Sequence, residues 1–331
     1  MLARWLNQKA LVAVAAIVIA TAGTILGLVL TGNSGASTPA RHAPAAGRQL
    51  LSPFTGEPVR SLGPVLAVKI DNIVYARPQT GLTSADIVYV LPVEGGLSRF
   101  LAVFSSHLPP VIGPVRSARE DDLELLRQFG RPAFAFSGAQ PQLLPVVEHS
   151  RIIDLYSGLV SGYYRGPGRI APYNLFARTA ALLAEAKGAS RAHSIGFTFG
   201  PAPAGGRVTP SMTVSYSSAS FTFRWSAPAG RWLVWMDGRR AASTEGPQLS
   251  AATVVIQYTT VRTSRFLEQG RRPPYAETTG SGTAVVLRNG RAFQARWSRP
   301  SADGGTAFTT GSGQPMPFAP GQVWIVLMAR P

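Results

Sequence analysis

The feature that most constrains this chain is an uncharged apolar run close to its start. Residues 10–30 carry no charged side chain, and the most polar of them are Thr21 and Thr24. A helix of about 20 residues spans the hydrocarbon core of a bilayer. The run therefore predicts one transmembrane helix over residues 10–30, which attaches the protein to the cell membrane.

The charges around this run predict its orientation. Two basic residues precede it and no acidic residue comes before Glu57, so residues 1–9 are expected in the cytoplasm and the rest of the chain outside. Arg41 and Arg48 lie beyond the run and weaken this asymmetry. The alternative is a cleaved secretion signal and a secreted protein. Such signals have apolar regions of only ~7 to 15 residues, so the length favours an uncleaved anchor.

Residues 31–50 are predicted to form a flexible linker. They are rich in Gly, Ser, Ala and Pro and almost lack large apolar side chains. They therefore bury too little surface to offset the entropy of ordering. The remainder of the 331-residue chain is long enough for two ordinary domains, and a hydrophobic content of 45% can build a core in each.

The amino-acid composition limits the kinds of functional site and binding partner that the chain can have. Cysteine is absent, which excludes disulfides, thiolate metal sites, a cysteine nucleophile and lipid attachment through an N-terminal cysteine. The net charge of +16 comes from 32 basic residues, all but three of them Arg, against 16 acidic ones. This ratio fits either codon bias in a GC-rich genome or a surface that attracts lipid headgroups and anionic envelope polymers. No nucleic acid is expected as a partner, because neither a stacking-aromatic motif nor a basic helix is present.

Residues 51–200 are predicted to form a mixed α/β domain. Short runs of β-branched and aromatic residues, bounded by Gly, Pro or Asp, predict strands over 64–70, 86–91, 100–105, 133–136 and 152–155. Several of these runs are apolar on both faces, as in a sheet covered by helices.

Three helices are expected in this domain. The clearest covers 117–129 and begins with a capping box of Ser117 and Glu120. A second covers 178–187. A third over 140–149 would be kinked or stopped by Pro145.

Residues 208–331 are predicted to form a second, β-rich domain. A Gly- and Pro-rich stretch precedes it, and no helical periodicity follows. Strand-like segments cover 214–216, 221–225, 232–236, 254–258, 284–288, 291–297 and 323–327. Asn289-Gly290 between two of them is a strong hairpin signal. The predicted fold is thus a transmembrane helix, a mixed α/β N-terminal domain and a β-rich C-terminal domain.

Standard catalytic signatures are missing from the sequence. It contains no P-loop, no H-E-x-x-H, no G-x-S-x-G and no dinucleotide fingerprint. The four histidines lie in unrelated contexts. Each is therefore interpreted as a surface or loop residue, and neither a metal nor a cofactor is expected.

Polar side chains collect at the ends of the predicted strands in the first domain. Asp71 and Asn72 follow one strand, Glu94 follows the next, and Arg99 opens a third. Ligands bind outside the carboxyl ends of strands in α/β sheets. These residues are therefore candidates for a binding site, together with Arg77, Gln79 and Asp86. The alternative is that the polar segments simply make turns.

The segment 113–119 favours an anion as the ligand. Arg116 and Arg119 flank Ser117, the expected cap of a helix whose free N–H groups attract negative charge. A second Gly-rich loop could converge on the same place with Arg165, Arg169 and Asn174. Alternatively, the acidic residues 120–122 occupy both arginines of the first segment in ordinary salt bridges.

These motifs resemble the YerB-like membrane lipoproteins, the family called domain of unknown function 3048. The matching stretches are V-K-I-D-N at 68–72, A-R-P-Q-T-G-L at 76–82, A-D-I-V-Y at 85–89, V-E-G-G-L-S-R-F-L-A-V-F at 93–104, I-G-P-V-R-S-A-R at 112–119, Y-R-G-P-G-R-I-A-P-Y-N-L at 164–175, V-V-I-Q-Y at 254–258, G-S-G-T-A-V-V-L-R-N-G at 280–290 and P-G-Q-V-W-I at 320–325. The resemblance implies an extracytoplasmic, membrane-attached protein with N- and C-terminal domains, and it implies no activity. The lipidated cysteine of the lipoprotein members is missing here, so the anchor is expected to be the helix itself.

The sequence leaves two functions open. The first is an envelope protein that binds an anionic ligand or wall polymer through the arginines of the predicted site. The second is an envelope enzyme that acts on a phosphate-bearing or glycan substrate, with Asp71, Asp86 or Glu94 as general base or metal ligand. Binding is favoured, because carboxylates without acid/base or metal spacing are weak signs of catalysis.

Overall fold

The structure is a computed structural model that describes residues 49–268 and 270–331. The predicted transmembrane helix over 10–30, residues 1–9 and nearly all of the linker lie outside the described residues. Among the residues that are described, no helix has the length and apolar character needed to cross a membrane. The described residues form one compact unit.

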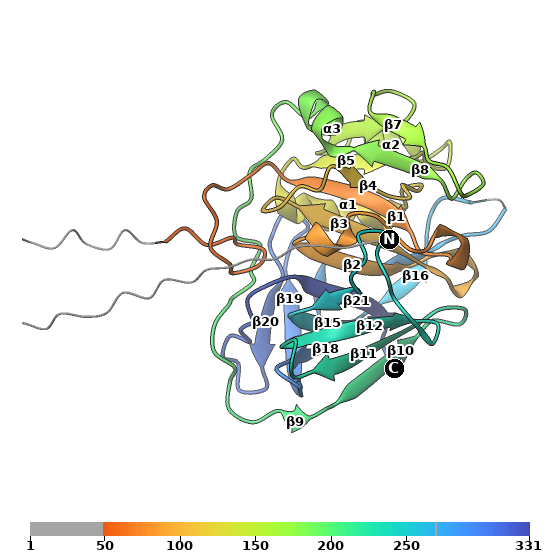
Figure 1. The fold of residues 1–331 in the computed structure, drawn as a ribbon. Coiled ribbons are helices and arrows are strands. Elements are labelled where there is room, and N and C mark those ends of the chain that lie inside the picture. Colours follow the sequence, from red (N-terminus) through yellow and green to blue (C-terminus); the bar gives the residue numbers. More distant parts are fainter. Residues whose placement is uncertain (1–48, 269) are drawn as a thin grey trace, which may run out of the picture. The chain divides into compact units, whose positions relative to one another are not determined.

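One large mixed sheet runs through this unit (Figure 1). Its strands come from both halves of the sequence: β1 (Leu66–Asp71), β2 (Ile87–Pro92), β3 (Ser98–Phe104), β5 (Ala133–Phe136), β6 (Ile153–Tyr156), β9 (Arg207–Val208), β15 (Thr253–Thr259), β18 (Gly280–Arg288), β19 (Arg291–Arg299), β20 (Ala307–Thr310) and β21 (Val323–Ala329). The spatial order is β20-β19-β18-β15-β21-β2-β3-β1-β5-β6, with β9 beside β19.

The two halves of the chain meet where β2 pairs with β21. These strands are parallel, with Ile87 opposite Val323 and Val90 opposite Val326. β21 also pairs with β15, and β2 also pairs with β3. An unbroken hydrogen-bond ladder therefore joins the two segments that the sequence predicts as successive domains.

Smaller elements cover the large sheet. A second sheet contains β10 (Ser211–Ser215), β11 (Ser220–Ser226), β12 (Arg231–Met236), β13 (Arg239–Arg240) and β14 (Ser250–Ala251). A third contains β4 (Val111–Ile112), β7 (Tyr163–Arg165) and β8 (Leu175–Arg178), and β16 (Val261–Thr263) pairs with β17 (Pro274–Ala276). The helices are α1 (Glu120–Leu126), α2 (Leu144–Glu148) and α3 (Thr179–Glu185), with 3-10 turns η1 (Val74–Ala76), η2 (Leu82–Ser84), η3 (Glu94–Gly96) and η4 (Arg127–Phe129).

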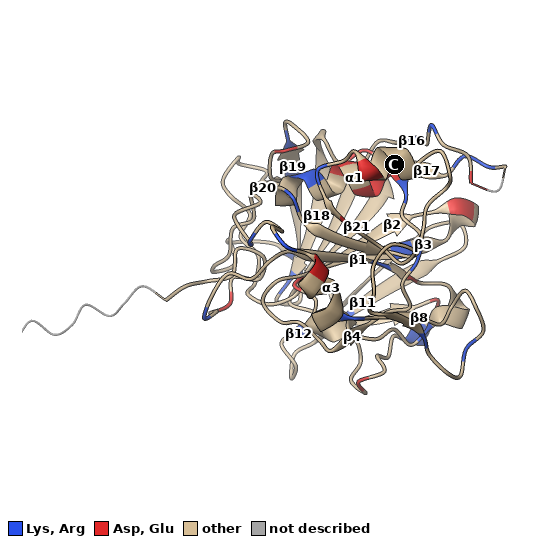
Figure 2. Ribbon diagram, turned by 90° about the horizontal axis from the view of Figure 1, so that it is seen from above, with Lys and Arg blue, Asp and Glu red and all other residues tan. Residues whose placement is uncertain are grey.

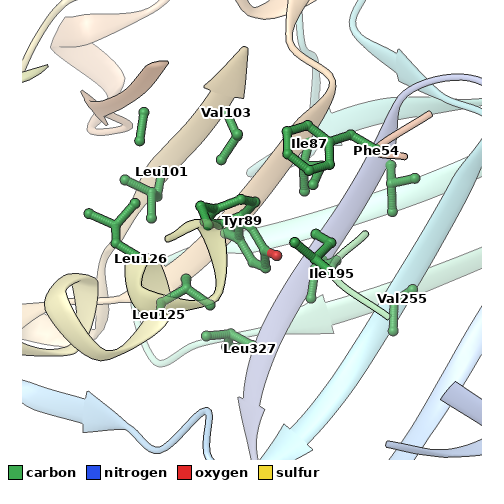
Figure 3. Close-up of a cluster of buried hydrophobic side chains, with 14 of the residues drawn as sticks. Phe54, Ile87, Tyr89, Leu101, Val103, Leu125, Leu126, Ile195, Val255 and Leu327 are labelled. Atoms are coloured by element: carbon green, nitrogen blue, oxygen red, sulfur yellow. The ribbon is translucent and has the colours of Figure 1, made fainter. Parts of the chain in front are cut away.

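Both faces of the large sheet are buried, because its central strands carry apolar side chains on both sides. On one face, Tyr89 and Leu101 pack with Leu125 of α1 (Figure 3). On the other, Phe100 and Trp324 pack against the aromatic residues of β11. A sheet covered on both faces is typical of near-continuous apolar strands.

The predicted strands are all present, with small shifts at their ends. The hairpin prediction is confirmed as well. Asn289 (φ 50°) and Gly290 (φ 71°) both have positive φ between β18 and β19. A two-residue hairpin turn of this kind favours Asn followed by Gly, because both positions require left-handed backbone.

The predicted start of the helix at Ser117 is wrong. The helix α1 begins at Glu120, and the backbone N–H of Arg119 donates to Asp122 Oδ2 at 2.7 Å. Glu120 takes no part in a capping box, because its carboxylate accepts hydrogen bonds from Ser264 Oγ and Arg265. The helix then ends at Leu126 and continues only as a 3-10 turn.

The predicted effect of Pro145 is also wrong. This residue lies in the first turn of α2, which runs from Leu144 to Glu148. Proline is tolerated there because the first N–H groups of a helix have no partner within it. Pro145 therefore lies within the first turn of this helix and does not stop it.

Candidate functional site

Alternation along the central strands places three charged residues on the face of the sheet that α1 covers. Lys69 and Asp71 are two residues apart on β1, and Asp71 lies opposite Arg99 of β3. Side chains two apart on a strand share a face. All three residues are buried, so each charge needs a compensating partner.

Four arginines converge beside these strands on a cavity of about 390 Å³. We call it the arginine pocket, and its lining residues are Glu94, Gly95, Arg99, Arg116, Arg119, Glu268 and Arg271. Four positive and two negative charges give the lining a formal charge of +2 (4 − 2). The pocket receives residues from both halves of the chain, since Glu268 and Arg271 follow β16.

Glu94 holds Arg119 in a two-pronged ion pair. Arg119 Nε lies 2.6 Å from Glu94 Oε1, and Nη2 lies 3.1 Å from Oε2. Burial acts to raise the pKa of Glu94, but the hydrogen bond and charge of Arg119 hold that pKa below its ordinary value. Glu94 is therefore a fixed anion. The alternative that the acidic residues 120–122 occupy Arg116 and Arg119 in salt bridges is wrong, because the partners are Asp71 for Arg116 and Glu94 and Glu268 for Arg119.

Arg116 lies against Asp71. Its Nε is 3.0 Å from Asp71 Oδ2, although neither atom has a hydrogen bond of good geometry. The guanidinium carbon also lies 5.9 Å from the centre of the Tyr173 ring. About a quarter of the side chain is exposed (24%), so part of the guanidinium remains open to the pocket.

Arg99 differs from both neighbours. Only 8% of it is exposed, and across residues 49–268 and 270–331 it forms no ion pair. Nη1 donates to the carbonyl of Ser117 at 3.1 Å. Burial, followed by the charges of Arg119 and Arg116, lowers the pKa of Arg99 to about 10, although the carboxylates of Asp71 and Glu94 act in the opposite direction. The group stays cationic at neutral pH, and a buried cation that forms no ion pair is unfavourable.

Three of the predicted site residues form a separate polar network next to η1. Arg77 Nη2 donates to the carbonyl of Asn72 at 2.7 Å, and Nη1 pairs with Asp237 at 2.7 Å. Gln79 Nε2 donates to Asn72 Oδ1 at 3.0 Å. These side chains do not line the arginine pocket. Their contacts hold the turn after β1 in place.

The second Gly-rich loop also stays outside the pocket. Arg165 donates to Asn174 Oδ1 at 2.8 Å, and Asn174 Nδ2 donates to the carbonyl of Arg169 at 3.0 Å. Arg169 in turn donates to the carbonyls of Ala76 and Pro78. The expected convergence of these three residues on the arginines of segment 113–119 is therefore not observed, because Arg165 and Asn174 bind within the loop and Arg169 binds the turn around η1. Tyr173 of the same loop does lie against Arg116.

Asp86 lies outside the pocket as well. Its Oδ2 accepts the backbone N–H groups of Ser105 and Ser106, which follow β3. Burial raises the pKa of this carboxyl group to about 6. The contacts give Asp86 a structural role at the junction of β2 and β3.

The acidic residues of α1 have partners that the sequence does not indicate. Figure 2 shows α1 with its acidic residues in red, close to β16 and β17. Asp122 forms an ion pair with Lys69, and Glu124 accepts the hydroxyl of Tyr275 at 2.8 Å. No local motif marks these partners, because they come from distant parts of the sequence. In the described ranges, no group of three or more His, Asp or Glu side chains is placed to hold a metal ion.

The fold and the pocket define a class of protein: two strand-rich segments that share one central sheet, with an arginine-lined cavity built from both. The chain belongs to the family of proteins of unknown function DUF3048. The N-terminal domain of this family matches residues 54–192, and its C-terminal domain matches residues 212–325.

Relatives from Bacillus subtilis agree with this assignment. The protein named "Putative lipoprotein YerB" is 28% identical over 313 residues, which cover 85% of this chain and 87% of that protein. The crystal structure of the YerB protein has the same fold, with a TM-score of 0.75 and 24% sequence identity, over 85% of this chain and 97% of that chain. The family resemblance inferred from the motifs is confirmed.

Proposed function

We propose that this protein is a membrane-attached envelope protein that binds an anionic group, a phosphate or a carboxylate, in the arginine pocket. The observation that carries the proposal is Arg99, a buried guanidinium that forms no ion pair with any described residue. An anion in the pocket would supply the missing partner. Charge-assisted hydrogen bonds of this kind are among the stronger polar contacts in proteins.

The neighbouring ion pairs support this role by fixing the walls of the pocket. Arg119 is locked by Glu94, and Arg116 rests against Asp71. Residues already held in place lose little freedom when a ligand arrives, which favours affinity. The lining still keeps an excess of positive charge.

The envelope location rests on two further observations. The uncharged run over residues 10–30 is long enough to span a bilayer, and the relative from Bacillus subtilis is named as a lipoprotein. We infer a single-pass anchor with residues 31–331 outside, where anionic wall polymers or lipid headgroups are the partners within reach. Protease added to intact spheroplasts should then digest the large domain. Survival of the domain until lysis would overturn this topology.

The alternative of an enzyme gains no support from the geometry. Asp71 and Glu94 each lie against an arginine, and Asp86 lies outside the pocket. A general base needs access to the proton that it removes. Binding is therefore the function that the arrangement supports best.

Binding can be tested by titrating inorganic phosphate into the full-length protein in a calorimeter. Arg99→Met should weaken binding by roughly tenfold or more, because a charge-assisted hydrogen bond contributes about 1.5–3 kcal/mol. The melting temperature should hold or rise, since a buried cation without an ion pair is replaced by an apolar side chain. Arg291→Met removes an exposed charge on β19 and is the matched control. Equal affinity in the wild type and both variants would overturn the proposal.

A further inference from the structure

A second cavity lies directly beside the arginine pocket. Its volume is about 400 Å³, within the range of roughly 300–1,000 Å³ that small-molecule sites occupy. Its wall includes Val93, Tyr216, Val261, Pro274 and Met328. We call it the apolar pocket.

The two pockets are neighbours because they share part of their walls. Glu94, Gly95 and Arg271 line both. The turn η3 therefore separates a cationic chamber from an apolar one. Gly96 in this turn has φ +70°, and a Cβ there would collide with the hydroxyl of Ser217. The close approach of the turn to the second sheet depends on that glycine.

Three of the polar side chains around the apolar pocket, those of Tyr216, Arg272 and Glu94, are already engaged by the protein. The hydroxyl of Tyr216 donates to the carbonyl of Leu327 at 2.8 Å. Arg272 Nη1 donates to the carbonyl of Arg265 at 2.7 Å, and Glu94 is paired with Arg119. The wall that these side chains leave exposed is mainly the apolar surface of residues such as Val93, Val261, Pro274 and Met328. A hydrocarbon chain needs no polar partner, and it gains by leaving water.

We infer that the two pockets together bind an anionic amphiphile drawn from the membrane, a lipid-like molecule with a phosphate head and one hydrocarbon chain. Arg99 and Arg116 hold the phosphate, and the chain lies between Val261 and Met328. The excess of positive charge around the arginine pocket favours a phosphate head. The inference rests on the proposed function, because the same arginines hold the head.

A series of alkyl phosphates with increasing chain length separates the binding of an amphiphile from the binding of an anion alone. Inorganic, butyl, hexyl and octyl phosphate are titrated into the full-length protein in nanodiscs of zwitterionic lipid, with empty nanodiscs subtracted. Affinity should rise roughly threefold to fourfold for each added methylene until the pocket is filled, following the free energy of burying a CH₂ group. Octyl glucoside, which has the same chain and no charge, should bind at least tenfold more weakly than octyl phosphate.

The apolar wall is tested by Met328→Gln, which keeps the length of the side chain and makes it polar. This variant should flatten the chain-length dependence and leave the affinity for inorganic phosphate unchanged. Met212→Gln on β10 is the matched control, because Met212 lines a different cavity. The series on the wild type decides the matter even if a variant does not fold.

The outcomes of these titrations distinguish a failure of this inference from a failure of the proposed function. If inorganic phosphate binds and affinity does not rise with chain length, this inference is wrong and the proposed function stands. If octyl glucoside binds as well as octyl phosphate, the arginines do not hold the head and this inference is wrong. If neither inorganic phosphate nor any alkyl phosphate binds, both the inference and the proposed function are wrong.

Discussion

Lys69 Nζ lies 2.6 Å from Asp122 Oδ1, and neither side chain exposes any surface. The pair fastens the first turn of α1 to β1, two residues before Asp71. Asp122 also accepts the N–H of Arg119 through its other oxygen. One buried carboxylate thus fixes both the start of the helix and the backbone of an arginine that lines the pocket.

Lys69→Met should lower the free energy of unfolding by about 3–5 kcal/mol, because it leaves Asp122 buried without its counter-charge. Urea denaturation measures the change. The double variant Lys69→Met/Asp122→Asn should recover part of the loss, since the uncompensated charge is removed. Lys187→Met is the control at an exposed lysine and should stay within about 0.5 kcal/mol of the wild type. Similar values for both single variants would contradict the role of the buried pair.

Glu124 should stabilise the contact between α1 and the segment after β17. Its Oε1 accepts the backbone N–H groups of Thr278 and Thr279, and its Oε2 accepts the hydroxyl of Tyr275. Glu124→Gln should lower the free energy of unfolding by about 1–3 kcal/mol at pH 7. Glu277→Gln, at a half-exposed glutamate paired with Arg262, should change it by less than about 1 kcal/mol.

The effect of Glu124→Gln should also depend on pH. Burial acts to raise the pKa of Glu124, but hydrogen bonds from Thr278 and Tyr275 hold it below the ordinary value of 4.5. A carboxyl group whose pKa is lower in the folded state stabilises the protein above its unfolded pKa. The difference between the wild type and the variant should therefore shrink as pH falls below 4.5. A constant difference would show that ionisation plays no part.

The pH dependence of stability that comes from Asp86 should have the opposite sign to that from Glu124. Burial raises its pKa from 3.8 to about 6, so the folded protein binds more protons than the unfolded chain between these values. The contribution of Asp86 to the free energy of unfolding should thus fall as pH rises from 4 to 6. Asp86→Asn removes this titration. The variant should gain stability relative to the wild type across that window, as measured by denaturation at several pH values, and a parallel pH profile would contradict the assignment.

The sequence predicted most of the strands because alternation and turn chemistry are local. Asn289-Gly290 needs only its own backbone preference to specify a hairpin. The pairing of β2 with β21 could not be predicted in this way, since it joins residues from opposite ends of the chain. The same limit explains the error at Ser117. The S-x-x-E pattern is present, but Glu120 finds Ser264 and Arg265, which the fold brings from the other half.

The candidate site also contains some residues that the sequence could group and others that only the fold brings together. Asp71, Glu94 and Arg99 could be grouped from the sequence because each lies at a strand end and those ends meet at one edge of the sheet. The contributions of Glu268 and Arg271 depend on how a distant loop folds back. No local pattern carries that information.

Arg116 should contribute to anion binding as well as pairing with Asp71. Arg116→Ala removes a partly exposed guanidinium from the pocket and should weaken binding of inorganic phosphate by roughly tenfold, the size of one charge-assisted hydrogen bond. The same change leaves the Asp71 carboxylate without its neighbour, so stability should also fall. Arg116→Ala/Asp71→Asn separates the two effects, because it removes the unpaired charge without restoring a cation. Recovery of the melting temperature with binding still weak would support a direct contact between Arg116 and the anion. Recovery of both would show that Arg116 serves only to neutralise Asp71.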